Sequence, residues 1–330
     1  MPTDNGSRTA ILLDCDTGVD DTMAIMLACL SPEIELVGVG TIWGNVDRDL
    51  ATQNSLNILA MCGRSDVPVA AGATTPLNGA DVDYGYFVHG KDGQGNRGMK
   101  GKYGKSIEMS AAEFIVDSCR KRPGEIELVP VGPLTNIALA LQLEPTLPKL
   151  VRGITIMGGA ALTPGNVSPV AEANIWHDAE AASEVFRAQW PITMVGLDVT
   201  MRTLLTEDHF DRMRNGGGIS KYLAQIAEFY TTFNQERSFG RRLSTMHDAV
   251  AVGLAANLVR AKVAPVVNVE VDTTDGPGRG QTICDLRGIY MNFPSQENAH
   301  CRVPLELEDG FPDFFTDLIV AAGEPAVNVE

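Results

Sequence analysis

ILLDCDTGVDDTMAIMLACL, from Ile11 to Leu30, joins an apolar run, a group of acids and a second apolar run. The first run predicts a buried strand, and the second predicts a helix that follows a sharp, glycine-containing turn. In an extended strand the period of two points Asp14 and Asp16 to the same side. Four carboxylates gather at this junction: Asp14, Asp16, Asp20 and Asp21. The stretch therefore predicts a strand, turn and helix with an acidic cluster at the strand's carboxyl end.

The acids allow two interpretations. Asp20 or Asp21 alone could cap free N–H groups at the helix start, where the helix dipole favours negative charge. Four carboxylates in a partly dry site, however, repel one another unless a cation or protons neutralise them. Carboxylate oxygens are ligands that favour Ca²⁺ or Mg²⁺ over zinc. Ligands of open parallel sheets also bind beyond the carboxyl ends of the strands, so we favour a metal site.

The rest of the chain repeats the alternation of strand and helix. Five further strands are expected: residues 34–42, a short strand that begins at Val67, the stretch IELVPV, a strand that begins at Gly153, and residues 192–200. The last of these ends at Asp198 and Thr200. These near-continuous apolar strands indicate a mostly parallel sheet with helices on both faces. No linker or repeat divides the 330 residues, so we predict one α/β domain over 1–330, with 1–8 as a flexible tail.

Composition limits the partners. A formal net charge of −16 argues against nucleic acid or an anionic membrane as the main partner, but not against a small nucleoside or sugar. Six cysteines without CxxC spacing indicate reduced, buried thiols. With no signal-peptide pattern and no apolar stretch long enough to span a bilayer, we expect a soluble, cytoplasmic protein.

Several polar residues could take part in a site, although each has a simpler explanation. Asn45 follows the second strand as a common turn residue, and His89 lies in the irregular, glycine-rich stretch 81–105, where a loop histidine is usually solvated. Asn166, Glu172 and Asn174 carry groups that bind sugar hydroxyls, but they could equally face solvent.

Two features of the C-terminal half are also open to two interpretations. An aromatic stripe on a helix is more often core than a wall for base stacking: Tyr222, Phe229, Tyr230 and Phe233. His247 and Asp248 stand next to one another before a helix, where the acid could be only a cap. An imidazole beside a carboxylate is also what acid–base chemistry needs near neutral pH.

A resemblance to a known family draws these pieces together. DCDTGVDD closely matches the N-terminal signature of the calcium-dependent nucleoside hydrolases of the inosine–uridine-preferring type. Further pieces follow in the family's order: GN at Gly44–Asn45, VPVGPLTNIA, IMGGA, GNVSPVAEANI, VGLDVT and HDAVAV. The resemblance covers nearly the whole chain and implies a single domain with a Rossmann-like, mostly parallel sheet. It also implies a homodimer or homotetramer with a role in nucleoside salvage.

The resemblance assigns roles to particular residues. It implies that calcium is bound by three carboxylates and one backbone carbonyl: Asp16, Asp21, Asp248 and Val131. It places six residues at the ribose: Asp20, Asn45, Met157, Asn166, Glu172 and Asn174. Asp16 would be the general base, His247 a candidate acid for the leaving base, and His89 a histidine near the base. The implied reaction is hydrolysis of the N-glycosidic bond by a calcium-activated water, with inversion.

Departures from the family pattern concern the base rather than the metal or the ribose. Asn234 stands where tyrosine is common, Ala173 stands where phenylalanine is common, and Trp43 and Trp176 are unusually bulky. Two alternatives to a nucleoside hydrolase remain. Asp14-Cys15-Asp16 mimics the DxD motif of haloacid-dehalogenase-type phosphatases, although glycine replaces the threonine or valine expected two residues later. The chain could also be a non-catalytic nucleoside-binding protein on the same fold.

Overall fold

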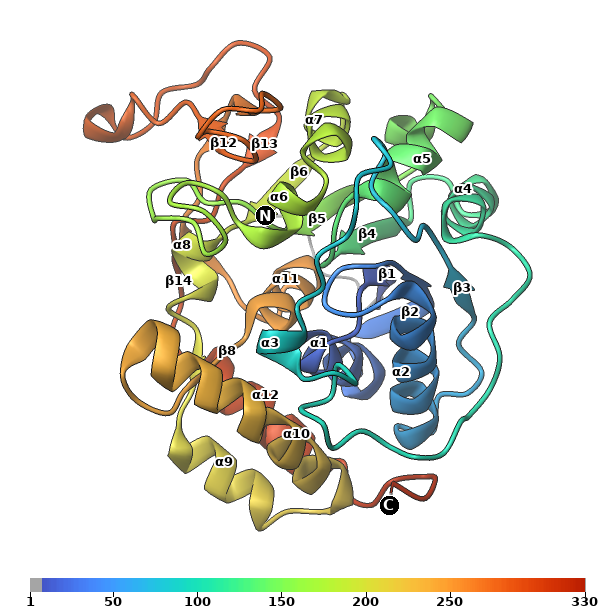
Figure 1. Cartoon of the computed structure of the whole chain (residues 1–330). Helices are drawn as coiled ribbons and strands as arrows, with labels where there is room; N and C mark the ends of the chain where they lie inside the picture. The colour runs from blue at the N-terminus through green and yellow to red at the C-terminus, as the bar shows by residue number, and fades with distance from the viewer. Residues whose placement is uncertain (1–7, 330) are drawn as a thin grey trace.

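The computed structural model describes residues 8–329, and the predicted flexible tail over 1–8 lies outside this range except for Arg8. Helices and strands alternate along most of the chain (Figure 1). Among the described residues, no helix has both the length and the hydropathy needed to cross a bilayer. All six cysteines are free thiols, of which Cys15, Cys119 and Cys301 are buried.

A central sheet of eight strands organises the domain, with the order β10-β13-β6-β5-β4-β1-β2-β3. Every neighbouring pair in it is parallel except β10 and β13. The strands are β1 (Thr9–Cys15), β2 (Ile34–Thr41), β3 (Val69–Ala71), β4 (Ile126–Pro130), β5 (Gly153–Met157), β6 (Ile192–Val195), β10 (Val266–Val267) and β13 (Cys301–Arg302). The mostly parallel α/β sheet predicted from the apolar runs is thus confirmed.

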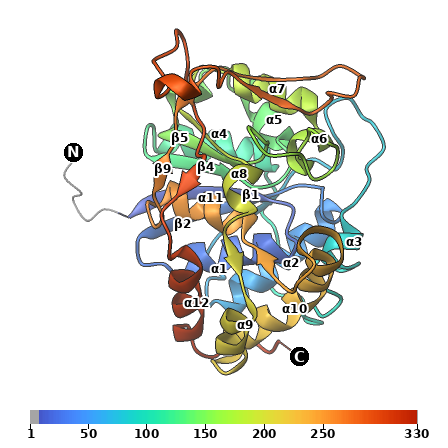
Figure 2. The ribbon, with the colours of Figure 1, turned by 90° about the vertical axis from the view of Figure 1, so that its left-hand side faces the viewer.

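Helices cover both faces of the sheet (Figure 2). They are α1 (Val19–Leu30), α2 (Arg48–Met61), α3 (Tyr86–His89), α4 (Ala111–Lys121), α5 (Thr135–Leu143), α6 (Ala173–His177), α7 (Ala179–Arg187), α8 (Leu197–Thr200), α9 (Glu207–Arg214), α10 (Gly218–Asn234), α11 (His247–Ala255) and α12 (Phe311–Ala321). The single turns are η1 (Leu147–Lys149), η2 (Gln235–Phe239, a π-helix) and η3 (Ile289–Met291). Three two-stranded sheets lie outside the central one: β7 (Leu204–Leu205) with β8 (Ser244–Thr245), β9 (Ala261–Val263) with β14 (Glu306–Leu307), and β11 (Val269–Val271) with β12 (Thr282–Cys284).

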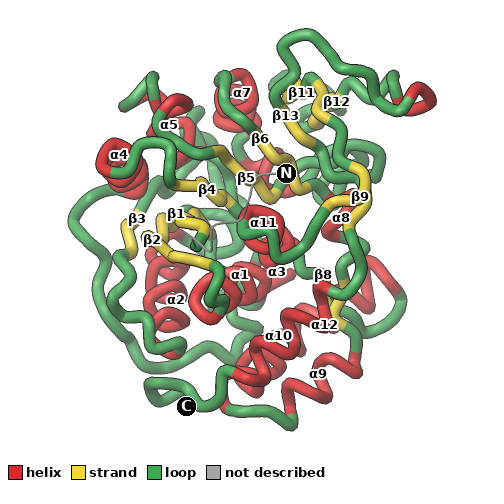
Figure 3. Tube along the Cα trace, turned by 180° about the vertical axis from the view of Figure 1, so that it is seen from behind, coloured by secondary structure: helices red, strands yellow, loops and turns green. Residues whose placement is uncertain are grey.

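The side chains of β1 point alternately to the two faces of the sheet, which explains why a layer of helices covers each face. Ile11 and Leu13 pack in a core with α1, α2, α10, α11 and α12, whereas Leu12 packs in a second core with α4, α5 and α7. Successive side chains of a strand point to opposite faces, so a strand that is apolar throughout needs helices on both. α1 also packs against α11, although more than 200 residues separate them in the chain (Figure 3).

Two expectations from the sequence are wrong in detail. The strand expected to reach Thr200 ends at Val195, and Leu197–Thr200 forms α8 instead. From α8, the carboxylate of Asp198 anchors the loop after β5, since it accepts hydrogen bonds from the amides of Ala161, Leu162 and Thr163 at 2.8, 2.7 and 3.1 Å. The stretch 81–105 is not wholly irregular, since it contains α3, a helix too short to show an apolar period.

Asn136 ties together the carboxyl ends of β1, β2 and β3. Its Nδ2 donates to Asp14 Oδ1 at 2.9 Å and to the carbonyl of Thr41 at 3.1 Å, and its Oδ1 accepts from the amide of Ala73 at 2.9 Å. Burial raises the pKa of Asp14 to about 7, and the bond from Asn136 opposes this rise. Asp14 is therefore engaged in holding the sheet together.

We expect Asn136→Leu to lower the free energy of unfolding by about 3 kcal/mol, because it removes these bonds and leaves buried polar groups without partners. Urea denaturation of the variant and the wild type measures the difference. A change below about 0.5 kcal/mol would show that the bonds of Asn136 do not support the strand ends.

Candidate active site

The strand order reverses between β1 and β4, and a cavity opens beyond the carboxyl ends of these strands. Open α/β sheets bind their ligands in the crevice at such a point. The cavity has a volume of about 490 Å³, which is enough for a small organic ligand. Asn45 enters it after β2, Val131 after β4, and Met157 at the end of β5. Each strand end thus supplies one group to a shared site.

Three carboxylates from the two ends of the chain meet in this region. Oxygen atoms of Asp20, Asp21 and Asp248 lie within 4.8 Å of one another, and all three residues are buried. At that distance two unit charges repel by about 3 kcal/mol at an effective dielectric constant of about 20. The arrangement brings together residues that the sequence could relate only through the family resemblance, and it needs a cation or protons to neutralise it.

Asp16 lies beside this group but is not one of the three. Its Oδ2 accepts a hydrogen bond from the amide of Asn45 at 2.6 Å, and its own amide donates to Asp21 Oδ1 at 3.1 Å. Its Oδ1 is buried and has no partner within residues 8–329. A buried carboxylate oxygen without a donor indicates an absent cation or proton donor. Asp14 lies apart, bonded to Asn136.

The carboxylates share one electrostatic environment. Burial, and then the charge of Asp20, raises the pKa of Asp21 to about 7. Burial also raises the pKa of Asp16 and of Asp248 well above its usual range, and the neighbouring aspartates add to the rise. The raised pKa values indicate that full ionisation of these carboxylates is unfavourable without a bound cation.

Gly18 is required where the chain turns from β1 into α1. A Cβ atom on this residue would lie 2.6 Å from His89 Nδ1 and 2.8 Å from Asn45 Nδ2. The amide of Gly18 donates to Asp21 Oδ2 at 2.7 Å, and Asn45 Nδ2 donates to the same oxygen at 2.9 Å. The glycine therefore lets two predicted site residues approach the acidic turn closely.

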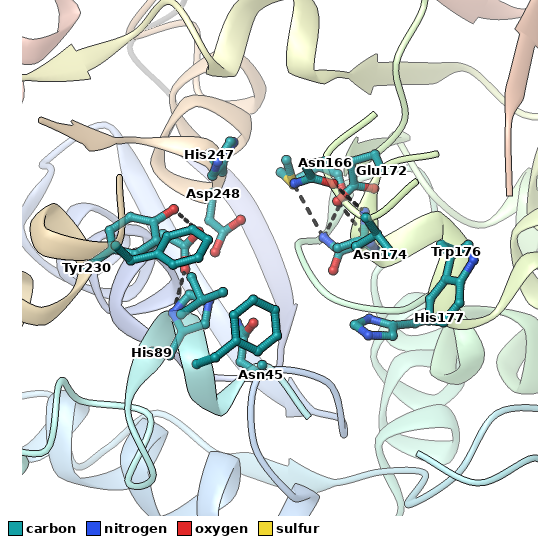
Figure 4. A pocket seen from close by; sticks show the side chains of 18 of the residues that line it. Asn45, His89, Asn166, Glu172, Asn174, Trp176, His177, Tyr230, His247 and Asp248 are labelled. Atoms are coloured by element: carbon teal, nitrogen blue, oxygen red, sulfur yellow. Dashed lines mark hydrogen bonds and ion pairs between the residues drawn. The ribbon is translucent and has the colours of Figure 1, made fainter. Parts of the chain in front are cut away.

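A second wall of the cavity carries the polar residues that follow β5. Asn174 Nδ2 donates to the carbonyls of Val131 and Met157 at 2.9 and 3.2 Å. Glu172 accepts from the amides of Gly159, Asn174 and Ile175 at 3.0, 2.9 and 3.2 Å. Burial nevertheless raises the pKa of Glu172 to about 7. These residues face the cavity rather than bulk solvent (Figure 4).

Asn166 completes this wall. Its Oδ1 accepts from the amide of Ala173 at 3.0 Å, which fixes the loop that carries it. Asn166, Glu172 and Asn174 all line the cavity, where Glu172 and Asn174 are buried and Asn166 is exposed to solvent.

The two histidines lie on the opposite side, near Asp20. His247 begins α11, and its Nδ1 is 2.7 Å from the hydroxyl of Thr200, so Nε2 is the nitrogen left for a ligand. His89 Nδ1 accepts from the amide of Val19 at 3.2 Å and is 3.6 Å from Asp20 Oδ1. Burial lowers the pKa of both rings, and the charge of Asp20 opposes this shift.

The sequence analysis missed part of the lining. Tyr230 belongs to the aromatic stripe, yet its hydroxyl lies 2.7 Å from Thr245 Oγ1 and 3.4 Å from Asp20 Oδ2, and its ring stacks on His89. His177 lines the cavity between Trp43 and Trp176, with ring centroids 5.6 and 5.8 Å away. Burial lowers the pKa of His177 to about 4. No spacing pattern in the sequence predicts that Tyr230 and His177 line the cavity. The one indication was the unusual bulk of the two tryptophans beside His177.

Comparisons with known proteins agree with this geometry. The sequence profile of "Inosine-uridine preferring nucleoside hydrolase" matches residues 11–311. The chain is 45% identical over 300 residues to a probable uridine nucleosidase 2 of Arabidopsis thaliana, covering 89% of this chain and 90% of that protein. It is 36% identical to an inosine–uridine preferring nucleoside hydrolase of Leishmania major, covering 96% and 98%. A purine-preferring ribonucleoside hydrolase from Gardnerella vaginalis superimposes with a TM-score of 0.85 at 34% identity, covering 95% and 98%.

Proposed function

Because the chain belongs to the inosine–uridine-preferring nucleoside hydrolase family, an N-glycosyl hydrolase family, we propose that it hydrolyses ribonucleosides to base and ribose at the β1–β4 crevice, with uridine among its substrates. The observation that carries the assignment to this crevice is the meeting of Asp20, Asp21 and Asp248 beside His247 in one cavity. The family match does not favour the phosphatase or the non-catalytic alternative.

Calcium is the cofactor that we propose. The residues fit a hard cation, since the donors are carboxylate and carbonyl oxygens and Asp16 Oδ1 is buried without a partner among the described residues. Asp16, Asp21, Asp248 and the carbonyl of Val131 would hold the ion. When bound, calcium orients the ribose diol and a water molecule and makes that water more acidic.

Asp16 is proposed as the general base. Its Oδ2 is fixed by the amide of Asn45, so Oδ1 is the oxygen that takes the water's proton. The C1′–N bond breaks with its electron pair passing to the base, while the water oxygen bonds to C1′ from the opposite side. Asp20 stabilises the positive charge on the ribose, and Asn166, Glu172, Asn174 and Met157 position the sugar.

His247 is proposed as the acid that protonates the leaving base, and His89 as a residue near the base. The hydroxyl of Thr200 fixes the His247 ring through Nδ1. Burial lowers the pKa of His247, and the charge of Asp20 opposes this shift. Water attack opposite to the base inverts the anomeric centre.

Three further proposals concern the whole protein. The six free cysteines support a cytoplasmic, reducing location. A homodimer or homotetramer is proposed from the family resemblance, and light scattering of the purified protein tests it. A role in nucleoside salvage follows if the nucleosidase activity is found.

The proposed activity predicts release of ribose from uridine, cytidine or inosine by the purified protein with calcium present. A reducing-sugar assay measures ribose, and chromatography identifies the free base. If no nucleoside yields ribose but the same nucleosides raise the melting temperature, the protein binds nucleosides without hydrolysing them.

A further inference from the structure

Residues 90–98, which we call the glycine loop, follow His89 directly and pack against the turn between β1 and α1. The cavity is lined by His89 but by none of residues 90–98, all of which the structure describes. The loop folds around the carboxylate of Asp92, which accepts hydrogen bonds at 2.8, 2.8 and 2.9 Å from three amides, those of Gln94, Asn96 and Gly98. The glycine loop therefore supports the site from outside the cavity.

Gln94 joins the glycine loop to the turn. The residue is buried, with only 1% of its surface exposed. Its Nε2 lies 3.1 Å from the carbonyl oxygen of Gly18, 2.9 Å from Thr22 Oγ1 and 3.0 Å from the carbonyl oxygen of Gly93. Its Oε1 accepts a hydrogen bond from the hydroxyl of Tyr222 at 3.2 Å. One buried amide group thus connects the loop with the start of α1 and with α10.

Gly18 connects Gln94 with Asp21. The carbonyl oxygen of Gly18 accepts from Thr22 Oγ1 at 2.7 Å, in addition to its contact with Gln94. The amide of Gly18 donates to Asp21 Oδ2 at 2.7 Å. Gly18 is the N-cap of α1 and has no side chain that could hold it in place. The bonds at its carbonyl therefore fix the residue whose amide orients the carboxylate of Asp21.

The glycine loop does not depend on the side chain of Gln94 for its own conformation. The bond from Gln94 to Asp92 uses the backbone amide, which any substitution other than proline retains. Asn54 Nδ2 also donates to the carbonyls of Thr17 and Asp92 at 3.1 and 2.9 Å, and so ties the loop to the turn independently. A change confined to the side chain of Gln94 should leave the loop in place and act on Gly18.

We propose that Gln94 is a positioning residue that acts through Gly18 to orient the carboxylate of Asp21 in the proposed calcium site. The inference rests on the proposed function, in which Asp21 is a calcium ligand. Hydrogen bonds that orient a metal ligand from behind typically contribute about 10- to 100-fold to metal affinity. Without Gln94 the ion itself would have to order Asp21, and this ordering reduces the free energy of binding.

Gln94→Met tests this role, because methionine is close to glutamine in length and volume but has no amide to donate to Gly18. Titration calorimetry of the EDTA-treated, dialysed protein with calcium chloride measures Kd without any turnover. We expect Kd to rise about 10- to 100-fold, and the calcium concentration for half-maximal ribose release to rise in parallel. At saturating calcium, kcat for uridine should stay within a few fold of the wild type, since Gln94 does not line the cavity.

Thr22→Val tests the same connection by a second route, and it decides the question if Gln94→Met does not fold. The substitution removes the hydroxyl that donates to the carbonyl of Gly18 at 2.7 Å. Kd for calcium should again rise, by about tenfold. An unchanged Kd in this variant would show that the carbonyl of Gly18 does not transmit any effect to Asp21.

Tyr222→Phe is the matched control. It removes the hydroxyl that donates to Oε1 of Gln94, so it weakens the same buried network on the side away from the turn. We expect a lower melting temperature but a calcium Kd within a few fold of the wild type. A purely structural role for Gln94 would make Gln94→Met and Tyr222→Phe alike, each with a lower melting temperature and an unchanged Kd.

The positioning role and the proposed hydrolysis fail in different ways. If the wild type binds calcium but releases no ribose, the hydrolase proposal fails, while a raised Kd in Gln94→Met still supports the positioning role. If the wild type does not bind calcium, the calcium proposal and the positioning role both fail. If Gln94→Met binds calcium as tightly as the wild type, or Tyr222→Phe weakens binding equally, the positioning role of Gln94 is wrong.

Discussion

Asp16→Asn is expected to release ribose about 10²- to 10⁴-fold more slowly than the wild type, the range typical of removing a general base. The substitution keeps the shape of the side chain and an oxygen that can accept from the amide of Asn45, but it removes the proton acceptor. Initial rates with saturating uridine and calcium measure the effect on kcat. A loss smaller than tenfold would assign the general base to another residue.

Asp14→Asn is the matched control for this variant. Asp14 is also buried and stands two residues before Asp16, near the end of β1, but its carboxylate is bonded to Asn136. Because burial already raises the pKa of Asp14 to about 7, a neutral amide should be well tolerated there. We expect its rate to stay within a few fold of the wild type, so that comparing the variants separates catalysis from the loss of a buried charge.

Calcium is expected to raise the melting temperature by several degrees, and by more at pH 8 than at pH 6. A free ligand concentration of about one hundred times Kd stabilises by about 2.7 kcal/mol. Asp21 has a pKa of about 7 in the fold, against 3.8 for an ordinary aspartate. The metal-free fold therefore keeps its stability at low pH and loses about 1 kcal/mol between pH 6 and 8, as this group ionises. Calcium removes that penalty.

Differential scanning fluorimetry with EDTA or calcium at each pH measures these shifts. Asp248→Asn should reduce the calcium shift strongly, because it removes the proposed calcium ligand that α11 supplies. A calcium shift that is equal at both pH values, or larger at pH 6, would contradict the assignment of the raised pKa values to the metal site.

The sequence predicted the sheet and the first half of the site because these depend on local patterns. Alternating core residues in β1 and the acids before α1 are neighbours in the chain, so their geometry follows from strand and helix periods. The link to Asp248 could come only from resemblance, since the packing of α11 against α1 is a long-range contact. The spacing of residues within a short stretch of sequence contains no information on a contact between distant parts of the chain.

The missed residues show the same limit. The aromatic stripe on α10 was interpreted as core, and Tyr222 is indeed buried there, with its hydroxyl 3.2 Å from Gln94 Oε1. Tyr230 is equally buried, yet it also meets Asp20. Burial alone does not separate a core aromatic from one that closes a binding site, because both are shielded from solvent. Only the position of the acids across the cavity distinguishes them.

The packing of α11 against α1 has a consequence for the synthesis of the protein. The turn after β1 leaves the ribosome early, but Asp248 and His247 follow only after more than 200 further residues. A nascent chain that has not reached α11 lacks both the proposed calcium ligand Asp248 and the proposed acid His247. A chain that terminates early would consequently be inert rather than partly active, and a bound ion would hold together segments made at the beginning and near the end of translation.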